Sequence, residues 1–113
     1  MNMLNSLILE GEVTRGLERH PDYDDFEVET TRYYKKEDET LGEEKSTFTV
    51  EVYGAMLKYE PFKRNVYEGR GVRIVGRLKQ RRWKDEKGKE FSRVVVIAEH
   101  IEYKPHVKKL PTD

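Results

Sequence analysis

Residues 70–83 alternate between two kinds of side chain, and this alternation constrains the fold of the chain more than any other feature. Even positions carry Val72, Ile74 and Leu78. Odd positions are interrupted by Val75 but otherwise carry the cationic side chains of Arg73, Arg77, Lys79 and Arg81, with Trp83 next in the same phase. A period of two is that of a β-strand, because successive side chains of a strand point to opposite faces. We therefore predict a strand with one face in the core and one cationic face.

The cationic face of this strand has two interpretations. A row of basic groups beside a large aromatic suits a surface that holds a phosphate backbone while a base stacks on the ring. The alternative is a solvated strand face, since basic side chains also keep strand edges soluble. Taken alone, residues 70–83 favour neither interpretation.

Length and composition limit the class of protein. A chain of 113 residues predicts a single domain. Charged residues make up 39% and hydrophobic residues 35%, so the apolar side chains must be concentrated on few faces or an oligomeric interface must add burial. The absence of cysteine excludes disulfides and thiolate metal sites and fits a reducing cytoplasm. The first residues lack a signal-peptide pattern, and no apolar run approaches the roughly 20 residues that span a bilayer.

The net charge of zero conceals an asymmetry between two segments. Residues 64–93 contain 11 Lys or Arg and 4 Asp or Glu, which gives +7, whereas residues 17–60 contain 6 and 13, which gives −7. The overall field of such a chain does not attract a polyanion, so any attraction must come from one local face.

The rest of the chain predicts four more strands and one short helix. Residues 4–13 carry apolar side chains in both phases, which predicts burial on two sides, by another sheet or by a partner subunit. Residues 15–25 form a polar connector, residues 35–45 a hairpin loop, and a turn is centred on Gly88. A short helix begins near Pro61, since proline suits the first helical turn. The other predicted strands are 26–34, 46–53 and 91–103.

Three strands, a helix and two strands predict an all-β fold. Five strands with two-sided apolar runs are buried most economically by closing into a small barrel. The five-stranded barrel with a short helix between its third and fourth strands is the OB-fold, which we predict for residues 1–105, with residues 106–113 as a short C-terminal extension.

Several segments, in order, resemble the bacterial single-stranded DNA-binding (SSB) protein family. They are residues 5–11, 26–34, 48–54, the run Glu68-Gly-Arg-Gly-Val-Arg-Ile-Val-Gly-Arg-Leu followed by Arg82-Trp83 and 85–88, and residues 94–102. The resemblance implies binding of single-stranded DNA without strong sequence preference, in replication, recombination and repair. It also implies a homotetramer and a cytoplasmic, nucleoid-associated location.

Carried over position by position, the resemblance implies base stacking on Tyr34, Tyr53 and Trp83. It implies phosphate contacts from the basic residues of the fourth strand and its hairpin, which are Arg73, Arg77, Lys79, Arg81 and Arg82. Each aromatic has the alternative role of packing on its neighbours, and Tyr33 competes with Tyr34 for the same role.

Four departures from the family pattern bear on the transfer of function. Thr47 stands where the family usually has another aromatic, so fewer platforms remain and Trp83 gains importance. The connector 15–25 is short and the segment after Gly54 is long, which alters loop geometry. The family's acidic, phenylalanine-tipped tail has no counterpart in residues 108–113. Either the natural protein lacks that tail or the sequence is truncated, so recruitment of replication or repair proteins through it stays open.

Other functions have less support in the sequence. His20, His100 and His106 are isolated, so we predict no metal site, no cofactor and no enzymatic activity. An OB-fold module for protein docking, of primosome type, stays open but fits poorly with the retained Trp83 and Tyr53. An RNA-binding OB module also stays open, because stacking does not read the 2′-hydroxyl.

Overall fold

The computed structural model describes residues 1–105, and the predicted extension 106–113 lies outside the described residues. Its elements, in chain order, are β1 (Leu7–Arg19), β2 (Asp24–Lys35), β3 (Leu41–Val52), the 3-10 helix η1 (Gly54–Lys58), α1 (Glu60–Asn65), β4 (Gly71–Lys84) and β5 (Glu90–Tyr103).

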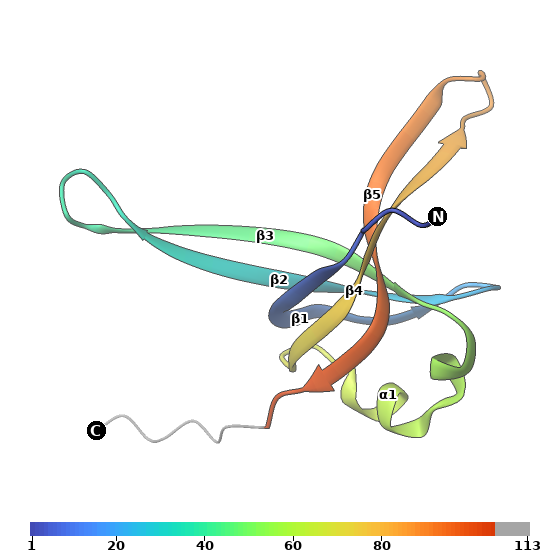
Figure 1. Ribbon diagram of the computed structural model, residues 1–113, viewed down its shortest axis with the longest axis horizontal. Helices are drawn as coiled ribbons and strands as arrows, with labels where there is room; N and C mark the ends of the chain where they lie inside the picture. Colours follow the sequence, from blue (N-terminus) through green and yellow to red (C-terminus); the bar gives the residue numbers. More distant parts are fainter. Residues whose placement is uncertain (106–113) are drawn as a thin grey trace.

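The five strands close into a barrel in the order β1-β2-β3-β5-β4 (Figure 1). β1 pairs with both β2 and β4, and every pairing is antiparallel except the short parallel contact between β3 and β5. With α1 between β3 and β4, the predicted five-stranded OB-fold barrel is confirmed. Pro61 lies in the first turn of α1, as predicted, because its fixed φ suits that turn.

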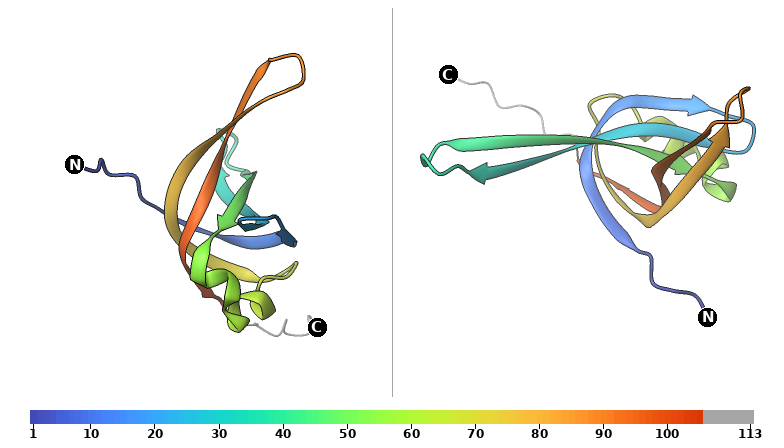
Figure 2. Two further views of the ribbon diagram at one scale, coloured as in Figure 1. Left: turned by 90° about the vertical axis from the view of Figure 1, so that its right-hand side faces the viewer. Right: turned by 90° about the horizontal axis from the view of Figure 1, so that it is seen from above.

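The core of the barrel consists mainly of β-branched side chains and receives residues from all five strands. Phe62 of α1 is fully buried and packs in this core. The helix itself lies at one end of the barrel, below β1 in Figure 2 (left). The other core residues are Val13, Phe26, Val28, Val50, Val52, Val66, Val72, Ile74, Val96, Ala98 and Ile101. Val72 and Ile74 of β4 (Gly71–Lys84) confirm the apolar phase predicted for residues 70–83.

Two hairpins, β2–β3 and β4–β5, project well beyond the barrel (Figures 1 and 2). β2 and β3 stay paired from Asp24 opposite Val52 out to Lys35 opposite Leu41. The predicted loop 35–45 is therefore wrong in its extent, because the ladder continues through its charged residues and only 36–40 form the turn. Within that turn Thr40 donates hydrogen bonds to the Asp38 carboxylate, and Glu39 takes the left-handed conformation.

The predicted connector 15–25 is also largely strand. β1 continues to Arg19, and Asp24 and Asp25 already belong to β2, so the turn covers residues 20–23. Register shifts in β1 on both sides of Arg15 bend the strand without ending it. The His20 amide donates to the Tyr23 carbonyl at 2.9 Å and closes the turn. The bent strand lies at the barrel surface and is therefore polar. Polarity alone indicates a loop for this segment.

Apolar side chains stay exposed on the single chain near β1 and β4. β1 begins at Leu7, later than predicted, and its outer phase leaves Ile8 71% exposed, while Leu4 ahead of it is 95% exposed. Leu78 and Phe48 share the phase of core residues but lie partly exposed. The second side of β1 is thus uncovered in one copy of the chain. No helix among residues 1–105 is long and apolar enough to cross a membrane.

Candidate nucleic-acid interface

The cationic phase of β4 lies on the outer surface of the β4–β5 ribbon. Arg77, Lys79, Arg81 and Trp83 share one face, because they alternate with the phase of Leu78. Their register partners on β5 are Ile97, Val95, Arg93 and Phe91. Val95 and Ile97 are buried although they lie outside the barrel core. On this face, therefore, long cationic side chains of β4 lie opposite buried apolar side chains of β5.

Trp83 and Phe91 form an aromatic pair near the outer end of this ribbon. Their ring centroids lie 5.8 Å apart with an interplanar angle of 15°, and Trp83 remains 46% exposed. Sequence reasoning did not select Phe91. The signal was present, because a turn centred on Gly88 places Phe91 opposite Trp83.

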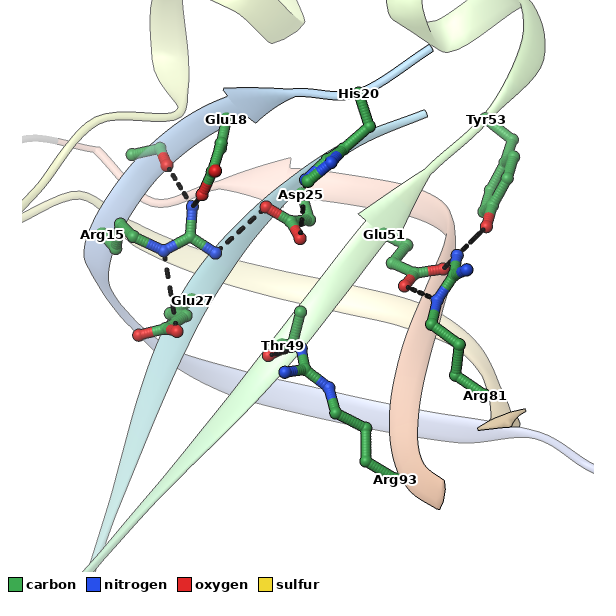
Figure 3. A network of polar contacts seen from close by, with 11 residues as sticks. Arg15, Glu18, His20, Asp25, Glu27, Thr49, Glu51, Tyr53, Arg81 and Arg93 are labelled. Atoms are coloured by element: carbon green, nitrogen blue, oxygen red, sulfur yellow. Dashed lines mark hydrogen bonds and ion pairs between the residues drawn. The ribbon is translucent and has the colours of Figure 1, made fainter. Parts of the chain in front are cut away.

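Tyr53 follows the last residue of β3 and joins a bonded cluster with Glu51 and Arg81 (Figure 3). Its hydroxyl donates to Glu51 Oε1 at 2.7 Å and accepts from Arg81 Nη2 at 2.7 Å. Arg81 grips the same carboxylate with two donors, Nε to Oε2 at 2.7 Å and Nη2 to Oε1 at 2.7 Å. Glu51 lies in the strand phase that faces away from the barrel core, yet its side chain is only 2% exposed because Arg81 pairs with it.

This cluster shifts the ionisation of all three groups. Burial opposes the charge on Glu51, but the hydrogen bonds from Arg81 and Tyr53 outweigh it and lower the pKa of the carboxyl. Burial, together with the hydrogen bond to Glu51, raises the pKa of Tyr53 to about 12. The bonded carboxylate also raises the pKa of Arg81. Arg81 and Glu51 are thus an ion pair at neutral pH.

The β1–β2 turn contributes two more rings to the same face. The Arg81 guanidinium lies 4.4 Å from the centroid of Tyr23, and His20 stacks on Tyr23 at 4.5 Å. Tyr23 in turn lies 5.3 Å from Tyr53. The sequence offered no signal for Tyr23, because the segment reads as a connector and only the closed barrel brings its turn beside β3 and β4.

Arg93 and Lys79 complete the cationic surface around a shallow hollow. Arg93 Nη2 donates to Thr49 Oγ1 at 2.6 Å, and Lys79 Nζ lies 5.5 Å from the Tyr53 ring centroid. Arg77 is exposed and makes no ion pair with residues 1–105. The hollow is lined by His20, Tyr23, Asp25, Glu51, Arg81, Trp83 and Arg93.

Three other predicted site residues, Arg73, Arg82 and Tyr34, lie apart from the Glu51–Tyr53–Arg81 cluster. Arg73 pairs with Glu10 at 2.9 Å and with Glu102 at 3.6 Å, its register partners on β1 and β5. Arg82 donates to Gln80 at 2.8 Å and alternates with Trp83, so it occupies the opposite face of the ribbon.

Tyr34 shares the phase of Phe26 and packs over Gly42, which has no side chain to block the ring. Its neighbour Tyr33 shares the phase of Glu51 and is more exposed. The structure therefore puts Tyr33, not Tyr34, in the strand phase that continues the outer face.

An arginine-centred network lies beside the hollow on β1 and β2 (Figure 3). Arg15 contacts Asp25 at 3.0 Å, Glu18 at 3.2 Å and Glu27 at 3.6 Å. His20 lies 3.2 Å from Asp25. Ligand atoms of Glu18, His20 and Asp25 lie within 4.8 Å of one another, but the Arg15 guanidinium already bridges the two carboxylates. The cluster is therefore an ion-pair network whose cation is part of the chain.

Comparison with known proteins identifies the family. The model of the single-strand binding protein family matches residues 4–104. The chain belongs to this family. It is 36% identical over 77 residues to the single-stranded DNA-binding protein of Aquifex aeolicus, covering 68% of this chain and 50% of the relative. It is 31% identical over 106 residues to that of Helicobacter pylori, covering 89% and 58%. The chain thus spans about half the length of these curated relatives.

Solved structures of family members share the fold of this SSB-family chain. A Plasmodium falciparum SSB in complex with single-stranded DNA matches with a TM-score of 0.78 at 16% identity, over 93% of this chain and 98% of that one. A deletion mutant of the Thermus aquaticus protein matches with 0.73 at 23%, over 91% and 51%. The small SSB of Streptomyces coelicolor matches with 0.67 at 19%, over 92% and 96%.

Proposed function

We propose that residues 1–105 bind single-stranded DNA without strong sequence preference, by stacking bases on aromatic side chains and contacting phosphates with Lys and Arg. The observation that carries the proposal is the half-exposed Trp83, which lies on a cationic face with Tyr53 and Phe91. A stacked base gains roughly 1 to 3 kcal/mol and any base can stack, because every base has a π-face. Membership of the single-strand binding protein family supports the same function. No catalytic step is part of the proposal.

Within this face we propose Trp83 and Tyr53 as stacking platforms and Arg77 and Lys79 as phosphate contacts. Both cations are exposed and lie in the phase of Trp83. The predicted roles of Tyr34, Arg73 and Arg82 remain proposals. Each role requires the bound DNA to continue past the hollow. It would have to reach the β2–β3 hairpin for Tyr34, the Glu10–Arg73–Glu102 cluster for Arg73, and the opposite face of the β4–β5 ribbon for Arg82.

The proposal is tested by titrating the protein with oligo(dT) at several salt concentrations. Trp83 is the only tryptophan, so quenching of tryptophan fluorescence reports stacking on this ring alone. We expect quenching and an affinity that falls as salt rises, since phosphate binding releases counterions. Binding without quenching would refute the role of Trp83, and absence of binding would refute the function.

Trp83→Ala gives a sharper form of this test. We expect it to weaken binding by about 1 to 3 kcal/mol, roughly 5- to 150-fold, and to leave the barrel folded because the ring is exposed. Anisotropy of a labelled oligonucleotide measures the affinity, and thermal melting checks the fold. Tyr59→Leu is the matched control, because Tyr59 is a similarly exposed aromatic that caps α1 away from the face. Equal affinities of the Trp83 variant and parent would contradict stacking.

Parallel titrations separate the alternatives. Tighter binding of oligo(rU) than of oligo(dT) would favour an RNA-binding module. Failure to bind either strand would favour a protein-docking module that has lost stacking. The proposal requires binding of oligo(dT).

We further propose that the chain assembles as a homotetramer and serves replication, recombination and repair in the cytoplasm, associated with the nucleoid. The exposed apolar side chains of Leu4, Ile8 and Leu78 support assembly, because burying them on a second copy would remove apolar surface from water. Light scattering tests the assembly, and a monomer at micromolar concentration would exclude it.

A further inference from the structure

We propose that Arg93 is a phosphate-binding residue beside Trp83, and that Arg81, its cross-strand neighbour, is a positioning residue that holds Tyr53 and neutralises no phosphate. The inference rests on the proposed binding of single-stranded DNA. It assigns the two arginines of one cross-strand pair to different tasks.

The two arginines start from equivalent places in the ribbon. Arg81 and Arg93 are directly opposite each other in the β4–β5 register, where like charges repel. Each guanidinium turns to a different residue of β3 (Figure 3). Arg81 reaches the Glu51 carboxylate with two donors at 2.7 Å, whereas Arg93 reaches the neutral hydroxyl of Thr49 at 2.6 Å. Arg81 is therefore compensated in charge, and Arg93 is not.

The carboxylates near Arg93 are already engaged by other cations. Glu27, opposite Thr49 in the β2–β3 register, pairs with Arg15 at 3.6 Å. Glu51, two residues after Thr49 on the same face, pairs with Arg81. Among the described residues, no carboxylate lies within ion-pair distance of Arg93. Its positive charge is thus available to a ligand in the hollow that it lines together with Trp83.

Arg81 has the opposite situation. The Glu51 side chain is 2% exposed, and withdrawal of the guanidinium toward a phosphate would leave a buried carboxylate without a counter-charge. Arg81 also donates to the Tyr53 hydroxyl, which itself donates to Glu51. Its planar fork therefore fixes the Tyr53 ring against Tyr23, and this contribution to binding does not depend on salt.

The test compares salt slopes of oligo(dT) affinity, measured by anisotropy between about 50 mM and about 1 M NaCl. We expect Arg93→Gln to flatten the slope by about 0.7, which is about an eightfold greater loss of affinity at the low salt than at the high salt. Arg81→Lys keeps the charge but lacks the fork, so we expect weaker binding by one common factor at every salt, with the parent slope. The matched control is Lys63→Gln, which removes one exposed charge from α1, at the opposite end of the barrel from the β4–β5 hairpin, and should behave as the parent (Figure 1).

Several outcomes would overturn the inference. A parent slope in Arg93→Gln would exclude its phosphate contact, and parent affinity in Arg81→Lys would exclude positioning by the fork. Should Arg81→Lys unfold, the variant Glu51→Gln with Arg81→Gln keeps the net charge of the pair and leaves no buried ion. A flattened slope in that double variant would show that Arg81 binds phosphate. Absence of salt-dependent binding by the parent would refute the proposed function, and this inference with it.

Discussion

Replacing Arg81 by methionine should destabilise the folded chain strongly and in a pH-dependent way. The substitution removes both guanidinium donors that hold Glu51, each at 2.7 Å. In the parent the Glu51 side chain is 2% exposed, and in the variant its carboxylate would keep only the hydrogen bond from Tyr53. A buried carboxylate without a counter-charge strongly destabilises the folded state, because its loss of hydration is no longer compensated.

The magnitude follows from the burial of the two partners. Removing one member of a buried ion pair typically costs about 3 to 5 kcal/mol. The Arg81 side chain is 32% exposed, so solvent screens part of its interaction with Glu51, and Tyr53 still donates to the carboxylate. We therefore expect the free energy of unfolding to fall by about 2 to 3 kcal/mol at neutral pH. For a chain of 113 residues this lowers the melting temperature by about 10 °C.

The effect should shrink in acid. In the parent the pKa of Glu51 is lowered below the ordinary value of 4.5, so its stabilising contribution is present above that value and is lost as pH falls through the folded pKa. Without Arg81, burial raises the pKa of Glu51, and protonation then relieves the buried charge of the variant. The difference between parent and variant should therefore narrow below about pH 5.

The free energies of unfolding of parent and variant are measured by urea unfolding, followed by circular dichroism at one fixed protein concentration, near neutral pH and near pH 4. The control is Arg81→Met combined with Glu51→Leu, which removes the pair without stranding a charge and should recover most of the loss. A loss below about 1 kcal/mol in the single variant, or a double variant no more stable than the single, would refute the reasoning.

Three further outcomes are expected. The pKa of Tyr53 is raised to about 12 from 10.0, so its contribution to stability is present below pH 10 and is lost as pH rises toward 12. Tyr53→Phe should flatten this alkaline decline in the free energy of unfolding measured with urea, and the same decline in variant and parent would contradict the shift. Gly76→Ala should cost about 2 kcal/mol or more, because its Cβ would meet the Ile97 carbonyl, whereas Gly16→Ala, with no neighbour nearer than 3.9 Å, should stay within about 0.5 kcal/mol of the parent in the same assay. Arg77→Gln should flatten the salt slope of oligo(dT) binding by about 0.7, and a parent slope would exclude a phosphate contact there.

Much of the fold was predictable because it depends on local periodicity. The alternation in residues 70–83 predicted β4 and its two faces, and Pro61 predicted the start of α1. The polar segments 15–25 and 35–45 were misread as loops, since polarity does not separate a loop from a strand that projects or bends at the surface. The bend near Arg15 and the full β2–β3 register are properties of strand pairs, not of single segments.

The candidate site divides in the same way. Trp83 and the cationic phase beside it could be selected from residues 70–83 alone, because a strand determines which side chains share a face. The roles of the individual cations could not be predicted from the sequence, because whether a cation is neutralised depends on its ion-pair partner, and the partners lie far away along the chain. Glu51 is 30 residues from Arg81, and Thr49 is 44 residues from Arg93. The sequence by itself determined that one face of the fourth strand is cationic and aromatic. Only the closed barrel, by bringing β3 beside β5, decided that one arginine of the Arg81–Arg93 pair is neutralised and the other is not.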